Sequence, residues 1–152
     1  MSNTLHSALF EQIQDTPNMM VGLNKNADHN EPMHVCLEDD NYDAFWIFTT
    51  KDNRIAGGGK AMAQFVSGDH KLFGSFSGYL VVETDKTTIQ DHFSTSISAW
   101  YKDGMLDDNM QVLRFDVESV EIWEKDPSMA AKLKMAIGAK VSEDELGRHA
   151  LV

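Results

Sequence analysis

The alternation of hydrophobic and polar residues in the first third of the chain predicts one helix followed by two strands. Between Thr4 and Gln14, apolar residues recur at helical spacing, and Pro17 follows soon after. Two short apolar runs come next, NMMVGL at 18–23 and PMHVCLE at 32–38, and turn-forming Asn and Asp residues separate them. We therefore expect a short amphipathic lid helix and then a strand hairpin.

The middle of the chain predicts two strands with a weaker element between them. The run AFWIFTT at 44–50 is apolar almost throughout, which indicates a central strand rather than a one-sided surface strand. In IAGGGKAMAQF at 55–65, Ala and Met favour a helix, but each of the three consecutive glycines weakens a helix by about 1 kcal/mol relative to Ala. We expect a short helix or a loop there. The run KLFGSFSGYLVVE at 71–83 is typical of a long strand, in which Gly74 and Gly78 mark bends, bulges or close backbone approaches.

The last third of the chain predicts a further helix and a second long strand. Asp85 is suited to cap a helix that ends at Trp100, because the apolar residues between them fall on one helical face. The run MQVLRFDVESVEIWE at 110–124 alternates as a strand, but its inward positions change parity part-way along. A bulge near Glu118 and Ser119 would restore the facing.

The order of these elements predicts the fold class. The tail at 126–140 begins with a cap-like Ser128 and carries Gly138 near its end, which indicates a terminal helix. The whole order suggests a mainly β (α+β) fold, a mostly antiparallel barrel with peripheral helices. No internal repeat, low-complexity tract or linker interrupts the sequence, so we expect a single domain over residues 1–152.

Composition and charge limit the classes of partner. The 152 residues are about the length of one domain, and they carry 13 Lys and Arg against 24 Asp and Glu, a formal net charge of -11. A polyanion is repelled by such a charge, so nucleic acid and acidic membranes are not expected partners. The sequence starts without a basic leader, and no apolar run reaches the roughly 18 residues that span a bilayer. With Cys36 as the single cysteine, we expect a soluble cytoplasmic protein without disulfides.

Familiar catalytic and metal motifs are missing from the sequence. The segment GGGKA lacks the first glycine of a phosphate-binding P-loop and has Ala61 where that loop needs Ser or Thr. No two histidines have the i, i+4 spacing of a helical zinc site, so no metal site is predicted. No GxSxG nucleophile motif occurs, and Cys36 lies in an apolar run where a buried thiol is usual. Hydrolase and thiol chemistry therefore have no support.

One strand end combines groups that suit a phosphate. Thr49 and Thr50 end the run at 44–50, and Arg54 follows within a few residues, so hydroxyls, backbone N–H groups and a guanidinium come together. The alternative is that the threonines reflect ordinary β-propensity and that Arg54 is a solvated surface residue.

The three tryptophans differ in their positions. Trp46 lies inside an apolar run and is expected in the core. Trp100 and Trp123 each stand at the end of an element, where an indole fills the core, floors a ligand pocket or forms a subunit contact. Both are therefore candidates for a binding site.

Four separated motifs, taken together and in order, resemble one known family. They are WIFTTKDNR at 46–54, GSFSGYLVVETD at 74–85, SAWYKDG at 98–104 and VLRFDVESVEIWE at 112–124. The chain is similar over nearly its whole length to the pyridoxamine 5'-phosphate oxidase-like family, in its bacterial general stress protein branch. This resemblance implies an FMN-binding split barrel that works as a homodimer, with FMN or FAD between the subunits.

The resemblance also implies roles for individual residues. The flavin phosphate is expected at the end of the central strand and in the turn after it, on Phe48, Thr49, Thr50, Lys51 and Arg54. The flavin ring is expected against the strand backbone at Met33, His34 and Val35. Trp100 and Trp123 complete the candidate cofactor site. No residue stands out as a general acid or base, so catalytic residues are not assigned.

Two positions depart from the family pattern. Ile55 follows Arg54 where many members have a second cation, and Glu31 precedes the Pro-Met of the second strand where members tend to carry Arg. A charge-assisted hydrogen bond is worth roughly 1.5 to 3 kcal/mol, so the loss of two lowers flavin affinity by roughly 10² to 10⁴. Flavin is then bound weakly unless Lys51 or Lys60 compensates.

These residues lead to a first functional hypothesis and two alternatives. The first is a flavin-dependent oxidoreductase or flavin carrier of the stress-response type, with an unknown substrate. It is not expected to make pyridoxal phosphate, because the C-terminal Arg-x-His pattern of true pyridoxamine phosphate oxidases is missing and Arg148-His149 lacks the spacer. The main alternative is a non-enzymatic dimeric barrel that has lost flavin binding. A third option is a flat ligand such as heme, suggested by His34 and His92 alone.

Overall fold

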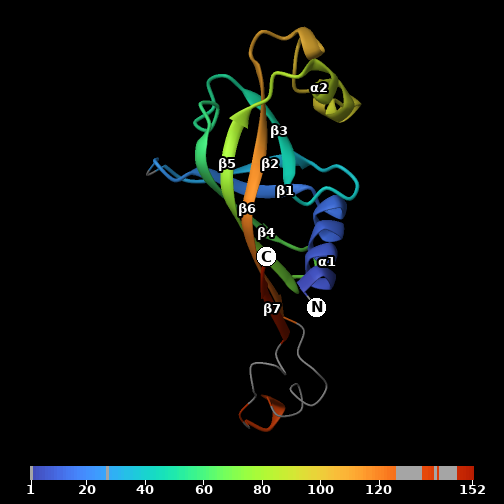
Figure 1. Cartoon of the computed structure of the whole chain (residues 1–152), viewed down its shortest axis with the longest axis vertical. Helices are drawn as coiled ribbons and strands as arrows, with labels where there is room; N and C mark the ends of the chain where they lie inside the picture. Colours follow the sequence, from blue (N-terminus) through green and yellow to red (C-terminus); the bar gives the residue numbers. More distant parts are fainter. Residues whose placement is uncertain (1, 27, 126–134, 139, 141–146) are drawn as a thin grey trace.

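Seven strands joined into one antiparallel sheet form the body of the protein in the part of the chain that the structure describes (Figure 1). The computed structural model describes residues 2–26, 28–125, 135–138, 140 and 147–152. The strands are β1 (Asn18–Leu23), β2 (Glu31–Cys36), β3 (Ala44–Thr50), β4 (Gly59–Val66), β5 (Leu72–Val82), β6 (Met110–Lys125) and β7 (Gly147–Leu151). The helices are α1 (Ser2–Asp15), α2 (Lys86–His92) and α3 (Thr95–Ser98), together with the 3-10 turn η1 (Gly104–Leu106).

Strand β6 closes the sheet into a barrel. The strand order is β3-β2-β1-β4-β5-β6-β7, and β3 also pairs with β6, from Thr50 opposite Met110 to Ala44 opposite Asp116. Because β5 occupies the other edge of β6, β7 must pair on the edge that β3 leaves, from Glu121 onward. Six strands therefore close into a barrel, and one edge of β6 is divided between β3 and β7. The antiparallel split barrel with peripheral helices that the sequence predicts is confirmed.

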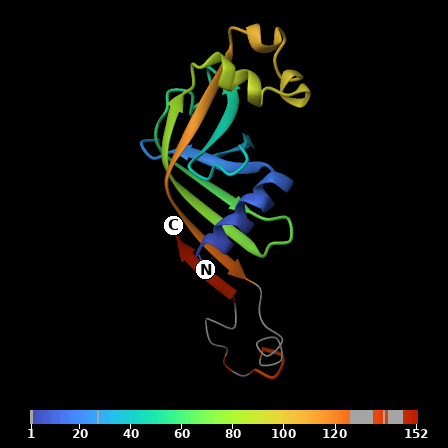
Figure 2. The same cartoon turned by 45° about the vertical axis from the view of Figure 1, so that its right-hand side comes forward.

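Helix α1 packs against the barrel and completes its core (Figure 2). The buried face of this helix consists of Leu5, Leu9, Phe10 and Ile13. Gly74 on β5 makes room for the helix, because a Cβ there would lie 2.9 Å from Leu9 Cδ2. Each fully buried aliphatic side chain contributes about 1.5 to 3 kcal/mol, so packing rather than intrinsic helix propensity holds α1 in place. The amphipathic helix predicted from its periodicity is confirmed.

The bulge predicted in the long C-terminal strand occurs at Glu118. The register of β5 and β6 shifts between Ser77 and Gly78, and Glu118 is the residue of β6 left without an opposite partner. Gly78 is required at this point, because a Cβ there would come within 2.0 Å of the Asp116 carbonyl oxygen. Both the bulge and the close backbone approach are confirmed.

The short helix or loop predicted at 55–65 is wrong for most of that segment. Residues 54–57 form a turn, Gly58 and Gly59 follow with positive φ angles of 73° and 123°, and β4 runs from Gly59 between β1 and β5. Every second side chain of β4 is buried, at Ala61, Ala63 and Phe65. Pairing with two neighbouring strands therefore outweighs the helix propensity of Ala and Met.

The helix predicted for 85–100 is interrupted. Asp85 caps α2 as predicted, and its side chain accepts a hydrogen bond from a backbone N–H of the first turn at 3.1 Å. The chain leaves the helical conformation at Phe93, and Ser94 then accepts a hydrogen bond from the Ile97 N–H at 3.3 Å. A second capping residue thus starts a second short helix, α3.

The C-terminal region contains a strand that the sequence did not predict. The helix expected at 126–140 falls mostly on residues outside the described part of the chain. Strand β7 pairs with the end of β6, from Gly147 opposite Lys125 to Leu151 opposite Glu121. Its sequence, GRHAL, is poor in β-branched residues and carries little local strand signal. None of the described helices is long and apolar enough to cross a membrane.

Candidate functional site

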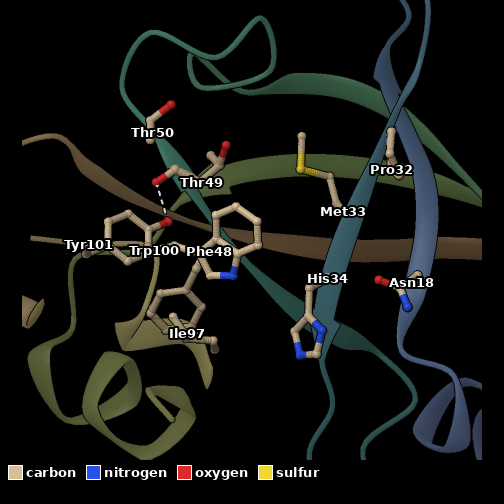
Figure 3. Close-up of a pocket in the computed structure, with 10 residues that line it drawn as sticks. All are labelled: Asn18, Pro32, Met33, His34, Phe48, Thr49, Thr50, Ile97, Trp100 and Tyr101. Carbon is tan, nitrogen blue, oxygen red and sulfur yellow. Dashed lines mark hydrogen bonds between the residues drawn. The ribbon is translucent and has the colours of Figure 1, made fainter. Parts of the chain in front are cut away.

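A cleft opens where β2 and β3 diverge (Figure 3). Within the described ladder, β2 pairs with β3 at two positions, Val35 and Cys36. Beyond these pairs the two strands separate. Residues 32–34 of β2 and 48–50 of β3 line a cavity of about 460 Å³ between them.

The segment after α2 forms a further wall of the cleft. Ile97 of α3 lines the cavity together with Trp100 and Tyr101, and Asn18 lines it from β1. The Trp100 side chain is 84% exposed although it borders the cavity, so its indole stands at the mouth. Apolar and aromatic side chains with a few hydroxyls are the usual lining of a small-molecule site.

A buried hydrogen bond ties this wall to β3. The Tyr101 hydroxyl donates to the Thr49 carbonyl oxygen at 2.8 Å (Figure 3). Burial, and to a lesser degree the charge of Asp107, raise the pKa of Tyr101 to about 12, so the hydroxyl keeps its proton. Sequence analysis missed Tyr101, although it follows Trp100 directly, because nothing local indicates a partner so far away in the chain. The bond holds Trp100 beside the cleft.

The free edge of β2 presents a backbone donor to the cleft. The Val35 N–H donates to the Pro17 carbonyl at 2.8 Å, on the β1 side of the strand. Because N–H groups alternate in direction along a strand, the His34 N–H points the other way, toward β3 and the cleft. Of the three residues expected here, Met33 and His34 line the cavity, whereas the Val35 side chain is buried in the core and does not.

A second hollow, of about 520 Å³, adjoins the cleft at Thr50. It is lined by Asp28, Glu31, Thr50, Asp52, Asn53 and Arg54. The Arg54 guanidinium is already engaged: its Nε lies 3.1 Å from Glu31 Oε2, and its Nη1 donates to the His29 carbonyl at 2.9 Å. Arg54, the residue expected to bind the flavin phosphate, is therefore paired with Glu31, the acid that stands where the resemblance led us to expect Arg.

The two lysines considered as substitutes do not reach this site. Lys51 is exposed and lines neither the cleft nor the second hollow. Lys60 forms an ion pair with Glu118, and its Nζ lies 5.0 Å from the centroid of the Tyr79 ring. Among the described residues that line the two hollows, Arg54 is the sole Lys or Arg.

Comparison with known proteins shows where this arrangement belongs. Residues 5–146 match the family described as pyridoxamine 5'-phosphate oxidase like. The chain belongs to this family. The resemblance inferred from the four sequence motifs is thereby confirmed.

Solved structures of general stress proteins are similar to this family member. The general stress FMN/FAD binding protein from Xanthomonas citri is 30% identical, with a TM-score of 0.77 and with 84% of this chain and 93% of that chain covered. A general stress family protein from Xanthomonas campestris pv. campestris is 29% identical, with a TM-score of 0.78 and coverage of 85% and 92%. A general stress protein 26 from Jannaschia sp. CCS1 has a TM-score of 0.78 at 23% identity, over 100% and 98%, and shares the fold. No curated protein sequence matches the chain.

In this family member, the missing second cation at position 55 has a structural cause. The Ile55 side chain is fully buried in the barrel core, and the Ile55 N–H donates to the Asn53 side-chain oxygen at 3.0 Å. A lysine or arginine at position 55 would have to bury its charge or leave the core. The position serves packing and not the binding of an anion.

Trp123, in contrast to Trp100, lies far from the cleft of its own chain. Met110 pairs with Thr50 beside the cleft, and at about 3.3 Å per residue roughly 40 Å of strand separate Met110 from Trp123. The Trp123 ring stacks on His149 of β7, with ring centroids 5.3 Å apart. The structure therefore does not bring Trp123 to the cavity that Trp100 borders.

The C-terminal Arg148-His149 pair is held by acids of β6. Arg148 contacts both carboxylate oxygens of Glu124, at 2.6 and 2.8 Å, and His149 Nε2 lies 2.8 Å from Glu121 Oε2. The expectation that this chain does not make pyridoxal phosphate stays a prediction.

The remaining candidates are packing residues. Trp46 is buried, as predicted; it donates to Glu83 at 2.9 Å and stacks on His92, with ring centroids 4.4 Å apart. His92 Nε2 also lies 3.4 Å from Glu38 Oε2. Burial raises the pKa of the Cys36 thiol to about 11, which keeps it protonated and a poor nucleophile.

Proposed function

We propose that this chain binds a flavin, FMN or FAD, with the flavin ring in the cleft between β2 and β3, and that it acts as a flavin-dependent oxidoreductase or flavin carrier. The observation that carries the proposal is the cleft itself. A free strand edge and apolar and aromatic side chains enclose the cleft. Its volume of about 460 Å³ lies within the roughly 300 to 1,000 Å³ that is usual for small-molecule sites. The name of the Xanthomonas citri relative, a general stress FMN/FAD binding protein, supports the choice of ligand.

The ring end of the cleft fits a flavin. Phe48, Ile97 and Trp100 offer apolar and aromatic surface to a flat ring system. The His34 N–H, which points away from β1, is placed to donate to a ring heteroatom. A bound flavin supplies hydride or electron transfer, and the chain supplies position, water exclusion and electrostatics.

The phosphate end fits less well, and this favours one alternative. The threonine hydroxyls of β3 can donate to a phosphate, but Arg54 is neutralised by Glu31 at 3.1 Å. A barrel that has lost flavin binding and serves as a non-enzymatic dimer is therefore the second candidate function.

A fluorescence titration separates the two candidates. Purified apo-protein is titrated with FMN, and quenching of flavin fluorescence reports binding. We expect saturation at micromolar FMN. Trp100→Ala is expected to weaken binding about three- to tenfold, since an aromatic contact contributes about 0.5 to 1.5 kcal/mol. Leu106→Ala is the matched control: this side chain is 86% exposed, does not line the cleft and should leave the affinity unchanged. No saturation at tens of micromolar FMN would favour the alternative.

We extend the proposal to a homodimer with the flavin between subunits. Exposed apolar side chains near the end of β5, at Tyr79, Val81 and Val82, and the exposed Trp100 support a protein contact. Sedimentation velocity measures the oligomeric state. Trp123→Ala tests the arrangement further, because Trp123 can contact a flavin only in the cleft of a second copy. A weaker FMN affinity in a variant that still sediments as a dimer is the expected result.

A further inference from the structure

The ion pair between Glu31 and Arg54 sets the charge at the phosphate end of the proposed flavin site. The Arg54 Nε lies 3.1 Å from the Glu31 carboxylate, and Nη1 donates to the His29 carbonyl at 2.9 Å. The Asn26 side chain donates to the Arg54 carbonyl at 3.4 Å and so connects the same turn to the loop after β1. Two edges of the guanidinium are thus occupied by groups of this chain.

The surroundings of this pair are acidic. In the part of the chain that the structure describes, the hollow that contains the pair is lined by three carboxylates, Asp28, Glu31 and Asp52, and by one guanidinium, that of Arg54. A phosphate monoester carries a charge of about -1.5 to -2 near neutral pH. The surplus of negative charge in this region would therefore repel the phosphate of a ligand. A ligand without a phosphate would not be repelled in this way.

We propose that this chain selects flavins by the ring and not by the phosphate, because Glu31 cancels the charge of Arg54. The ligand class is then flavins with or without a phosphate, and riboflavin binds about as tightly as FMN. The inference rests on the proposed flavin function and specifies which part of the ligand is recognised.

The geometry explains why the pair is not simply displaced by a phosphate. The Arg54 and Glu31 side chains are 37% and 32% exposed, so the attraction between them is weak and a competing anion can reach the guanidinium. An anion that does so comes to lie beside the Glu31 carboxylate, and the repulsion offsets much of the new attraction. Thr49 and Thr50 remain as neutral donors, which contact a phosphate and a ribityl hydroxyl alike.

The test compares the affinities of riboflavin and FMN in three proteins. These are the unchanged chain, Glu31→Gln, and Glu118→Gln as the matched control. Glu118→Gln removes the same charge from another exposed acid–base pair, with Lys60, that borders neither hollow. Fluorescence titration measures each dissociation constant, and circular dichroism shows that each variant is folded.

We expect the two flavins to bind the unchanged chain within about threefold of each other. Glu31→Gln should raise the affinity for FMN by about tenfold, because the Arg54 guanidinium is then free to form a charge-assisted hydrogen bond with the phosphate. The affinity for riboflavin should not change. The gain should shrink at high salt. Glu118→Gln should change neither affinity.

Two results would overturn the inference while leaving the proposed function intact. One is FMN binding to the unchanged chain at least about tenfold more tightly than riboflavin. The other is an equal gain for FMN in Glu31→Gln and Glu118→Gln, which would show a general effect of net charge. Failure of all three proteins to bind either flavin would overturn the proposed function itself, and the inference with it.

Discussion

The hydroxyl of Tyr101 donates a 2.8 Å hydrogen bond to the carbonyl oxygen of Thr49. This bond connects the turn after α3, which carries Trp100, to β3, which lines the same cleft. Burial raises the pKa of Tyr101 to about 12, so at neutral pH the hydroxyl keeps the proton that it donates.

Tyr101→Phe is expected to lower the free energy of unfolding by about 1 kcal/mol, the usual net worth of such a bond. The substitution should also lower the affinity for FMN severalfold, because Trp100 is no longer held beside the cleft. Chemical denaturation and the FMN titration measure the two effects. Tyr42→Phe, which removes the hydroxyl of a tyrosine that lines neither the cleft nor the second hollow, is the control and should change neither. Loss of stability without any change in FMN affinity would show that the bond does not position the cleft.

The same tyrosine predicts a change of stability at high pH. The folded protein holds the Tyr101 proton more tightly than the unfolded chain does, because the pKa rises from 10.0 to about 12 on folding. The contribution of protonated Tyr101 to the free energy of unfolding is complete below pH 10 and is lost as pH rises toward 12. Denaturation series across this range should show a steeper loss of stability for the unchanged chain than for Tyr101→Phe. Parallel curves would contradict the assignment.

Gly78→Ala is expected to be among the most damaging small substitutions in the barrel. An added Cβ would lie 2.0 Å from the Asp116 carbonyl oxygen, so β5 and β6 would have to separate at the bulge. A loss of about 3 kcal/mol or more in unfolding free energy is expected. Gly57→Ala is the matched control, since nothing lies within 4 Å of its added Cβ, and it should stay within about 0.5 kcal/mol. Urea unfolding measures both.

Glu83 predicts how stability responds to acid. Burial alone would raise the pKa of this carboxyl, but hydrogen bonds from the Trp46 indole and the N–H groups of Thr84 and Asp85, with the charge of Arg114, together lower it below 4.5. The contribution of Glu83 to the free energy of unfolding is therefore present above pH 4.5 and is lost as pH falls through the lowered pKa. Glu83→Gln should give a flatter acid limb in a series of unfolding measurements. An unchanged limb would mean that other carboxylates dominate acid unfolding.

Features that depend on local periodicity or on close neighbours in sequence could be predicted without a structure. The amphipathic spacing of α1, the cap at Asp85 and the parity change that requires the bulge at Glu118 are examples. Each is decided by residues within a few positions, so the sequence carries the signal directly. The four motifs predicted the family in the same way, and the fold came with it.

Features that depend on partners distant in sequence were decided by the tertiary structure. The segment at 55–65 has the residues of a weak helix, yet it becomes β4 because β1 and β5 offer it two edges to pair with. Strand β7 forms because β3 leaves one edge of β6 free.

The candidate site likewise has some features that the sequence indicated and others that only the tertiary structure shows. Its sequence already indicated Thr49 and Thr50 at a strand end and singled out Glu31 as unusual. That Glu31 binds Arg54, and that Tyr101 anchors Trp100, emerge only when separate elements fold together. From the sequence alone, Thr49, Thr50 and Trp100 could be expected at the cleft, whereas Tyr101 could not. The tertiary structure decided which side chains are already paired with each other, because pairing depends on distances in space that no local pattern records.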